Sequence, residues 1–452
     1  MLPYFSKFFS MNKLIRCLLI LLITLPFTST ELTGQVKKPS RPQRTQRTQK
    51  PKPPVVAKCS RKADSLELVK FYQAFNGQDW FKKWDLTKPV DTWHGVSITK
   101  SGCVSEIIMT SNNLKGTIPI LTLPAMIQLM LDEKQVSGPI PNFATLPNLK
   151  SLIVKSELTT GGIPNFNKLP ELEYLDLSSV SLTDTIPNFD KTPLLEELYL
   201  SGSFIGIVPD FNKLPKLFSL EISSPGLKGS LPSFTKIPLL RTLSISNTNI
   251  QGKIPEWAIN NQIQNLDLSD NQLQGQIPGF KNFIKLETLI LSGNQLSGTL
   301  PALTSSVNLS EIMLQENQLV GDIPDYILPK LRTLWLQNNK LSGLIPDFKN
   351  IRELRDLNLS HNELSGRLPD FNYLPLLENV HLEHNQLTGE IPNFLKLNRL
   401  LTLHINDNKL TGKIPDFSNL PKLMTFHVYN NPLKGKAPKF KKSPHLADLK
   451  VN

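Results

Sequence analysis

Cysteine, glycine and long apolar runs are all scarce in this sequence. Among 452 residues there are 3 cysteines and 23 glycines, which excludes a disulfide-dense small scaffold and a collagen-like repeat. The main apolar run, from Cys17 to Phe27, has eleven residues, whereas a helix that spans a membrane needs ~20. We therefore expect neither a multi-span membrane protein nor a transmembrane segment in the mature chain.

The short motifs of common active sites are also missing. The sequence contains no phosphate-binding glycine-rich loop, no G-x-S-x-G nucleophile elbow and no H-E-x-x-H zinc helix. Isolated acids are numerous but form no diagnostic pair. We therefore predict a protein that is not an enzyme and needs no cofactor, and keep a carbohydrate-active enzyme only as a third functional alternative.

Acidic residues are absent from residues 36–58, which carry eight Lys or Arg and five prolines. Residues 1–35 add a charge of +2, so only +2 of the formal +12 remains for the rest of the chain. Because the basic character belongs to one end, we expect no nucleic-acid partner for the folded body. Residues 36–58 are predicted to be a disordered linker, either a solvated stalk or an electrostatic anchor to an anionic envelope polymer.

Residues 1–35 have the pattern of a secretory signal peptide. Lys13 and Arg16 precede the apolar run, and small polar residues follow it as far as Gln35. The sequence therefore predicts an extracytoplasmic protein, either secreted or held at the cell surface.

A recurring proline shows that most of the chain is an internal repeat. Its fifteen copies, usually preceded by Ile, Leu or Val, are spaced by 22 or 23 residues and stand at 119, 141, 164, 187, 209, 232, 255, 278, 301, 324, 346, 369, 392, 415 and 438. Ahead of the proline lies a shared apolar pattern, seen clearly in LRDLNLSHNELSGRLP at 354–369. Its L-x-L core alternates with period two, which predicts a short strand with one buried face, and the Asn, Gly and Pro that follow predict turns.

An aromatic residue usually stands two positions after the proline. The positions are Phe143, Phe166, Phe189, Phe211, Phe234, Trp257, Phe280, Tyr326, Phe348, Phe371, Phe394, Phe417 and Phe440. Because all of them share one register of the repeat, we predict a stack of rings inside the protein, along the axis of the repeats.

From about Val104 to the end of the chain, these patterns resemble the plant-type leucine-rich repeat, L-x-x-L-x-L-x-x-N-x-L-x-G-x-I-P. The resemblance implies an α/β-type, mostly β solenoid over 104–452, a right-handed curved superhelix whose concave face is a parallel sheet of about 16 strands. Its strands would begin at Val104, Met126 and Leu149, and the last would begin at Leu446.

The asparagine of the repeat is not kept throughout. In repeats two to seven it is replaced by Lys134, Glu157, Val180, Ser203, Pro225 and Thr248. We therefore expect a less regular ladder of turns in the first half of the solenoid.

Residues 59–103 are predicted to form an N-terminal cap over the first repeat. Residues 64–75 have helical apolar spacing, with Asp64 as the expected N-cap, and three tryptophans follow as core residues, namely Trp80, Trp84 and Trp93. The segment is similar to the caps of secreted bacterial repeat proteins. No equivalent cap is recognisable at the other end, where we expect an open strand edge guarded by Lys450.

Cys59 and Cys103 are the cysteines that remain after removal of the leader, one at each edge of the cap. In an oxidising compartment two such cysteines favour a disulfide over a metal pair or a reactive thiol, for which no partners lie nearby in sequence.

The residue between the two core leucines of each strand should face the concave side. Read along the repeats, this row is Ile108, Met130, Ile153, Asp176, Tyr199, Glu221, Ser244, Asp267, Ile290, Met313, Trp335, Asn358, His381, His404, His427 and Lys450. Neighbouring members should lie about 4.8 Å apart, the spacing of paired strands. Three consecutive histidines therefore form a ladder, and His361 and His384 occupy matching positions at the adjoining turn.

Three interpretations of the histidine patch stay open. In the first, duplicated repeats simply carry duplicated surface histidines. In the second, the patch contacts a ligand. In the third, His381, His404 and His427 hold a metal, although a flat row gives poor tetrahedral geometry. The candidate ligand-binding residues are Trp335, Asn358, His381, Glu383, His404, Asn406, His427 and Tyr429.

Two functional hypotheses follow. In the first, a secreted or cell-surface protein recognises an extracellular protein, peptide or glycan through the concave sheet, since a rigid solenoid lowers the ordering cost of binding. In the second, the protein is a structural or adhesive envelope component whose basic linker does the attaching.

Overall fold

The structure is a computed structural model that describes residues 59–178, 181–257, 262–417, 419–438, 440 and 445–451. The chain divides into two compact units, Met1–Val55 and Val56–Asn452, and all of the described residues belong to the second. The predicted signal peptide (1–35) and linker (36–58) lie outside the described residues. Within them, no helix is long and apolar enough to cross a membrane.

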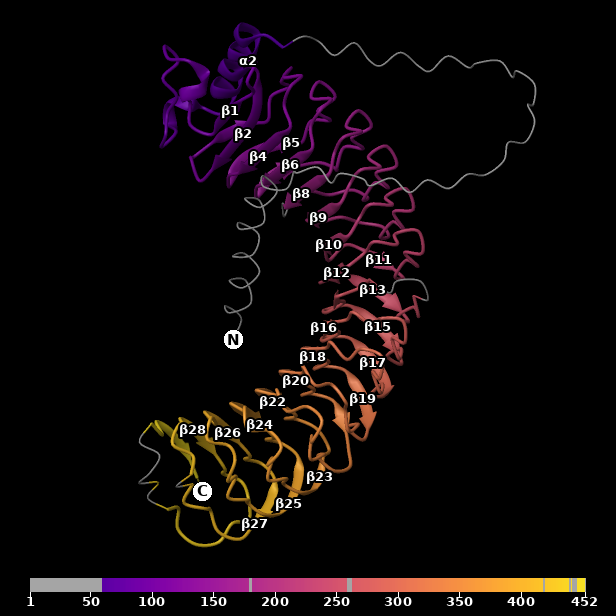
Figure 1. Cartoon of the computed structure of the whole chain (residues 1–452), viewed down its shortest axis with the longest axis vertical. Coiled ribbons are helices and arrows are strands. Elements are labelled where there is room, and N and C mark those ends of the chain that lie inside the picture. The colour runs from indigo at the N-terminus through magenta and orange to yellow at the C-terminus, as the bar shows by residue number, and fades with distance from the viewer. Residues whose placement is uncertain are drawn as a thin grey trace, which may run out of the picture. The chain divides into compact units, whose positions relative to one another are not determined.

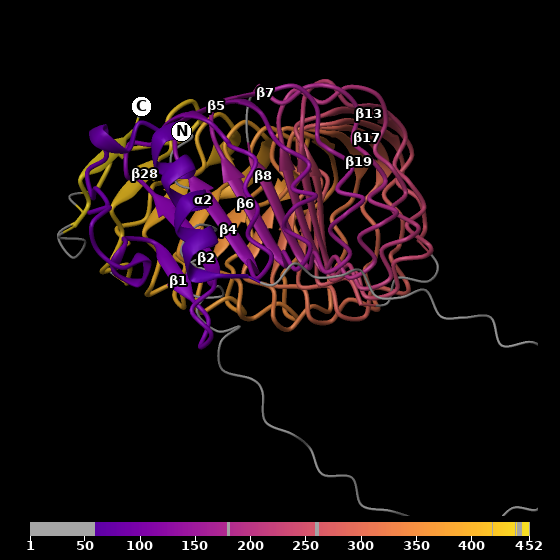
Figure 2. The same cartoon turned by 90° about the horizontal axis from the view of Figure 1, so that it is seen from above.

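The second unit is a curved solenoid lined on its concave side by one long sheet (Figure 1, Figure 2). The sheet has 17 strands, of which only β1 is antiparallel to its neighbour. Its strands are β1 (Val96–Ile98), β2 (Val104–Thr110), β4 (Gln128–Asp132), β6 (Ser151–Lys155), β8 (Tyr174–Ser178), β9 (Glu197–Ser201), β10 (Ser219–Ser223), β12 (Thr242–Ser246), β14 (Asn265–Asp267), β16 (Thr288–Ile290), β18 (Glu311–Met313), β20 (Thr333–Trp335), β22 (Asp356–Asn358), β24 (Asn379–His381), β26 (Thr402–His404), β28 (Thr425–His427) and β29 (Asp448–Lys450). The predicted fold class is therefore confirmed, with β1 of the cap as an additional strand.

The leucines of each repeat point into the coil. In the repeat that contains β22, Leu354, Leu357, Leu359 and Leu364 are at most 1% exposed. The first of these lies two residues before the strand, in the turn that closes the preceding coil. Strand β4 was predicted to begin at Met126 but begins at Gln128. The first apolar position of each repeat packs inside that turn and not in the strand.

From β4 onward, the length of the strands differs between repeats without and with the asparagine; β2, which precedes Asn112, has seven residues. The strands β4 to β12 of the main sheet have five residues each and lie in repeats without the asparagine, whereas those from β14 onward have three. In the latter, as at Asn294, the side-chain amide donates to the carbonyls of Leu268, Leu291 and Ser292 and accepts from the backbone N–H of Leu273. The predicted difference between the two halves of the solenoid is thus found in how the strands end.

In the second and third repeats the residue before the predicted position takes over this role. Glu133, not Lys134, is buried and accepts from the backbone N–H of Asn112, while Ser156, not Glu157, is buried and donates to the carbonyl of Val136. In these two repeats the buried polar side chain thus stands one residue earlier than the consensus predicts.

Three shorter parallel ladders, which the sequence did not predict, run beside the main sheet. They are formed by β3 (Lys115–Thr117), β5 (Gln135–Pro139) and β7 (Leu158–Thr160); by β11 (Lys228–Gly229), β13 (Asn249–Gly252), β15 (Gln272–Gly275), β17 (Gln295–Thr299), β19 (Gln318–Gly321) and β21 (Lys340–Leu341); and by β23 (Ser365–Arg367), β25 (Gln386–Glu390) and β27 (Lys409–Thr411). They contain the glycine of the repeat, as at Gly366, where φ is +78° and an added Cβ would lie 2.2 Å from Leu344. The glycine is therefore needed for its left-handed conformation, whereas the exposed side chain of Leu344, on the preceding coil, can move aside.

The predicted column of rings is confirmed in the core. Successive rings such as Phe143 and Phe166, or Phe371 and Phe394, are buried with centroids 6.4 and 6.3 Å apart. Their backbone is left-handed, with φ of 49° at Phe143 and 52° at Phe371, which is rare for a bulky residue. Leu303 interrupts the column in the same left-handed conformation, with φ of 49°.

The cap consists of α2 (Arg61–Ala74), two short 3-10 helices, η1 (Gly77–Asp79) and η2 (Val90–Thr92), and β1. The prediction that Asp64 is the N-cap was wrong. The N-cap is Ser60, whose side chain accepts from the backbone N–H of Ala63. Asp64 instead lies in the first turn, where it is buried and accepts from the backbone N–H of Val104 at 2.8 Å. This carboxylate thereby ties the helix to the first strand of the repeats.

The core of the cap is aromatic, as predicted. Trp80, Trp84 and Trp93 are at most 5% exposed, and the rings of Trp84 and Trp93 stack with centroids 5.0 Å apart. Cys59 and Cys103 form a disulfide with a Cα–Cα distance of 5.9 Å, which joins the start of the cap to the residue before β2. The predicted pairing of these cysteines is therefore present in the structure.

Candidate functional site

The concave row of side chains has the register expected from the repeat. Trp335 pairs with Asn358, Asn358 with His381, His381 with His404, and His404 with His427. The same register joins the row from Ile108 through Met130 and Ile153 to Asp176 at the other end of the sheet. One residue per repeat thus builds a continuous line along the concave face.

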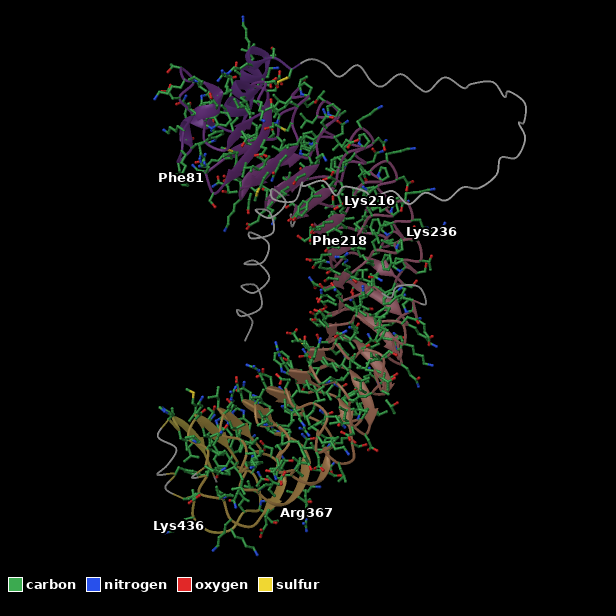
Figure 3. All side chains as sticks on the ribbon, viewed as in Figure 1. Phe81, Lys216, Phe218, Lys236, Arg367 and Lys436 are labelled. Atoms are coloured by element: carbon green, nitrogen blue, oxygen red, sulfur yellow. A yellow bond between two sulfur atoms is a disulfide. The ribbon has the colours of Figure 1, made fainter. Side chains whose placement is uncertain are left out.

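The chemistry of this line changes along the solenoid. Its middle part is polar and acidic: Asp176 is buried and paired with Lys155 at 3.0 Å, and the hydroxyl of Tyr199 donates to Glu197. Burial, together with the neighbouring Glu197 carboxylate, raises the pKa of Tyr199, so this phenol stays protonated at neutral pH. Figure 3 places Phe218 toward the concave side of this part, while Lys236 and Arg367 project from the outer rim.

An apolar stretch separates the acidic part from the histidines. Ile290, Met313 and Trp335 follow one another in register on β16, β18 and β20. Ile290 and Trp335 are half-buried, and Met313 is 7% exposed. The indole and the isoleucine therefore offer partly exposed apolar surface on an otherwise polar face.

The histidine ladder is present as predicted, and its rings are in contact. The rings of His404 and His427 stack with centroids 4.1 Å apart, and His381 meets His404 edge to face at 4.7 Å. His427 is additionally held by Asp448 on β29, with 2.8 Å between Nε2 and the carboxylate oxygen.

His404, at the centre of the ladder, is electrostatically constrained. Burial, followed by the adjacent imidazoles of His381 and His427, lowers the pKa of His404 from 6.5 to about 4. The ring is therefore neutral at physiological pH. Its Nε2 atom is buried and has no hydrogen-bond partner.

Glu383 lies beside the ladder, two residues after His381 on the same side of the strand. Its Oε1 atom is 3.7 Å from Nδ1 of His381, whereas its Oε2 atom is buried and without a partner. Burial alone would raise the pKa of Glu383, but the interactions with His381, with its own backbone N–H and with His404 lower it. Glu383 is thus an anion at neutral pH.

Of the remaining candidate residues, Asn358 lies at the end of β22, whereas Asn406 and Tyr429 lie two residues after β26 and β28, and several are already engaged. The side-chain oxygen of Asn358 accepts from the backbone N–H and the hydroxyl of Ser360, and the amide of Asn406 donates to Asp407 at 2.6 Å. The ring of Tyr429 lies 6.3 Å from that of His427. The structure therefore brings all eight candidates together, with Asn358 and Asn406 acting as supports of the local turns.

A second histidine pair lies at the turn beside the ladder. The rings of His361 and His384 stack at 4.2 Å, and Nε2 of His384 is 3.5 Å from Asp407. Their predicted matching positions are confirmed. The involvement of Asp407 and Asp448 was not predicted, because each belongs to the next repeat and no local motif marks it.

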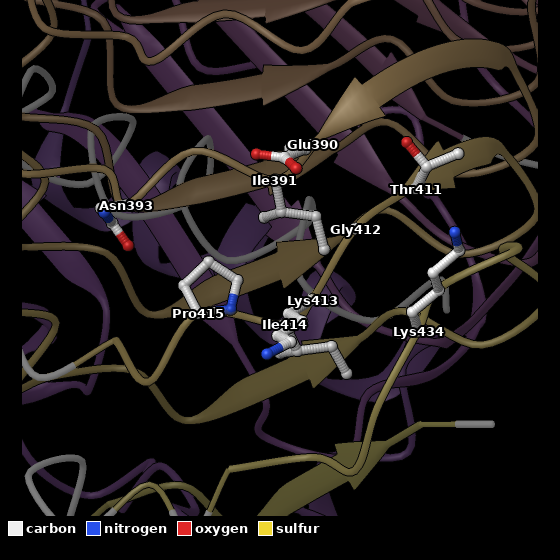
Figure 4. Close-up of a pocket in the computed structure, with 9 residues that line it drawn as sticks. All are labelled: Glu390, Ile391, Asn393, Thr411, Gly412, Lys413, Ile414, Pro415 and Lys434. Carbon is white, nitrogen blue, oxygen red and sulfur yellow. The ribbon is translucent and has the colours of Figure 1, made fainter.

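A shallow pocket lies away from the concave row. It is formed by neighbouring coils around β25 and β27, with Glu390, Thr411, Lys413 and Lys434 among its lining residues (Figure 4). None of the candidate residues takes part in it. The concave line thus remains the candidate site.

The fold is that of a leucine-rich repeat solenoid. A family model described as Leucine Rich Repeat matches residues 239–261, 262–283, 285–306, 330–350 and 353–372. None of the curated proteins compared with the chain matches it in sequence.

Solved structures of plant receptors resemble the chain. The ectodomain of the Arabidopsis receptor kinase HAESA, in complex with an N-terminally extended IDA peptide hormone ligand, is 27% identical over 87% of this chain and 73% of that one, with a TM-score of 0.70. The plant peptide hormone receptor RGFR1, in complex with RGF2, is 29% identical over 75% of this chain and 61% of that one, with a TM-score of 0.65.

A bacterial protein is similar as well. A leucine-rich repeat protein of Leptospira interrogans is 26% identical over 70% of this chain and 87% of its own length, with a TM-score of 0.58. The architecture is thus shared by proteins of plants and bacteria.

Proposed function

We propose that the protein is a secreted or cell-surface binding protein that recognises an extracellular peptide, protein segment or glycan through the concave sheet. The observation that carries the proposal is the in-register line from Ile290 to His427, where partly exposed apolar and imidazole side chains adjoin on parallel strands. Such a line suits an extended ligand. A ligand that lies along the row would cross successive strands and contact one side chain of each.

Two further observations support this function. The HAESA and RGFR1 ectodomains, which share the solenoid, are both complexed with peptide hormones. The disulfide between Cys59 and Cys103 suits an oxidising compartment, in agreement with the signal peptide predicted for residues 1–35. Among the three ligand classes, these likenesses favour a peptide.

Peptide and glycan arrays test the proposal. Wild-type protein should retain a reproducible set of ligands, and Trp335→Ala should weaken them by at least about tenfold, as expected for a central aromatic contact. Leu344→Ala is the matched control, since Leu344 is 66% exposed and borders a different ladder. Binding that is lost equally in both variants, or absent from the wild type on every array, would contradict the proposal.

The alternative function is a structural or adhesive envelope component. It is supported by the charge distribution, since residues 36–58 carry eight basic residues and no acid. In that case deletion of 36–58 abolishes salt-sensitive retention on cell envelopes, while Trp335→Ala leaves it intact. Retention that survives the deletion would exclude the alternative.

A further inference from the structure

Two buried polar atoms on the concave face lack a partner, and they belong to residues whose ligand atoms lie within 4.8 Å of one another. They are Nε2 of His404 and Oε2 of Glu383. Buried polar atoms in folded proteins are nearly always satisfied, and leaving one unsatisfied is costly. Two such atoms in neighbouring residues call for a partner that the described part of the chain does not supply.

His381 completes the group. It is the last residue of β24, Glu383 follows two positions later on the same side, and His404 is the register partner of His381 on β26. One ligand atom from each of the three side chains lies within 4.8 Å of the others, and this is the one such group among the residues that the structure describes.

We propose that His381, Glu383 and His404 bind a single Zn²⁺ ion. Two imidazole nitrogens and one carboxylate oxygen are a ligand set that zinc takes up in proteins, with a fourth position left open. Zinc bonded at about 2.0–2.1 Å in a tetrahedron requires ligand atoms about 3.3 Å apart, so the side chains, whose ligand atoms lie within 4.8 Å, close by up to about 1.5 Å around the ion. This site goes beyond the proposed binding of an extracellular ligand and does not depend on it.

The free atoms of the group suit a divalent cation. The oxygen of Glu383 and the nitrogen of His404 that lack a partner would each gain one from the metal. A metal ion that gives both unsatisfied atoms a partner at once is the energetic reason for the site.

The third histidine of the ladder is not a ligand in this arrangement. Nε2 of His427 is already 2.8 Å from Asp448, and its ring stacks face to face on His404. His427 therefore acts as a positioning residue that fixes the plane of His404. The flat row of three histidines considered from the sequence is replaced by two histidines and a glutamate from neighbouring strands.

The nearby pair of His361 and His384 provides a control. His384 faces Asp407, but that carboxylate also accepts from Asn406 and Asn430, so its oxygens are already engaged. His384 is in addition among the exposed side chains. Replacing both histidines of this pair removes a cluster of similar composition and leaves the proposed ligands unchanged.

Calorimetric titration of the purified protein with zinc chloride at pH 7.5 tests the site. The wild type should bind one zinc ion per chain, and Glu383→Gln and His404→Gln should each weaken binding by at least about tenfold. The double variant His361→Gln/His384→Gln should bind as the wild type does. Absence of binding by the wild type, or equal binding by Glu383→Gln, would overturn the proposal.

Cobalt(II) substitution gives a second readout that does not depend on stability. A tetrahedral site with two imidazoles and a carboxylate should produce visible absorption bands in the wild type that are absent from Glu383→Gln. Circular dichroism confirms that each variant is folded. Cobalt bands that persist in folded Glu383→Gln, or that disappear only in the His361/His384 double variant, would place the metal elsewhere.

Discussion

At the scale of single residues, His404 links the concave surface to stability. Its pKa in the folded protein is about 4, below the ordinary 6.5, owing to burial first and then to His381 and His427, with Glu383 and Asp448 opposing the shift. Below pH 6.5 the unfolded chain takes up a proton that the folded chain refuses. The contribution of His404 therefore destabilises the protein as pH falls from 6.5 to about 4, and levels off below that.

Urea denaturation in the absence of zinc, at pH 7.5 and pH 5.0, checks this prediction. The free energy of unfolding should be lower at pH 5.0 in the wild type, and His404→Gln should reduce the difference. His361→Gln, which removes a histidine from the adjoining turn, should retain it. An unchanged pH dependence in His404→Gln would show that His404 titrates normally.

Asn294 represents the residues that close the ladder of turns. It is 8% exposed, donates to three backbone carbonyls and accepts from the N–H of Leu273 in the preceding coil. Asn294→Ala leaves these groups buried without partners, so we expect a loss of about 2–4 kcal/mol in the free energy of unfolding. Chemical denaturation measures it, and a loss below about 0.5 kcal/mol, the level of an ordinary surface change, would contradict the role.

At the scale of elements, the column of rings holds the coils at a fixed spacing. Phe371 is 1% exposed and lies against Phe394 with centroids 6.3 Å apart. Phe371→Ala should cost about 3–5 kcal/mol, since it leaves a cavity between two coils. Phe371→Leu should cost less, because Leu303 occupies the same position with the same left-handed backbone. Thermal unfolding that ranks the two variants equally would argue against the packing explanation.

The cap is fixed to the repeats by a covalent bond and by a buried carboxylate. The disulfide between Cys59 and Cys103 closes a loop with a sequence separation of 44 residues. On the chain-entropy model, Cys59→Ser/Cys103→Ser should lower the free energy of unfolding by about 4 kcal/mol. Reduction of the wild type should reproduce the change, whereas two free thiols in the mature, oxidised protein would show that the bridge is not formed.

The elements also show how far sequence patterns lead. The period of 22 or 23 residues, the alternation of L-x-L and the register of the aromatic residues predicted the strands and the core, because each of them repeats many times, and the resemblance to the leucine-rich repeat implied the parallel sheet. The helix cap was misassigned to Asp64 because the same residue type can cap a helix or bridge to a distant strand. The buried position of Glu133 was missed because the repeat consensus places the buried polar residue one position later.

For the site, the sequence predicted which residues share the concave face but not what they contact there. The ladder of His381, His404 and His427 follows from the repeat alone. Two features depend on side-chain positions between repeats. Glu383 and His404 each have an unsatisfied buried atom, and His427 is hydrogen-bonded to Asp448. The spacing of the repeats does not predict such contacts, because the repeat consensus allows any polar residue two positions after a histidine of the ladder.

At the scale of the whole solenoid, function depends on neighbouring coils acting together. No single repeat contains the site: its side chains come from β20 to β28, and each coil is covered by the next. Nearest-neighbour stacking makes the concave line rigid, and a rigid line lowers the ordering cost of binding an extended ligand.

Site-specific photo-crosslinking in the native extracellular environment tests this account most directly. A photoreactive amino acid at position 335, on the concave line, should give a discrete covalent adduct, whereas the same group at the exposed position 344 should give none. An excess of unmodified protein should compete for the partner and reduce the adduct. Equal crosslinking at both positions, or none at position 335, would contradict recognition through the concave sheet.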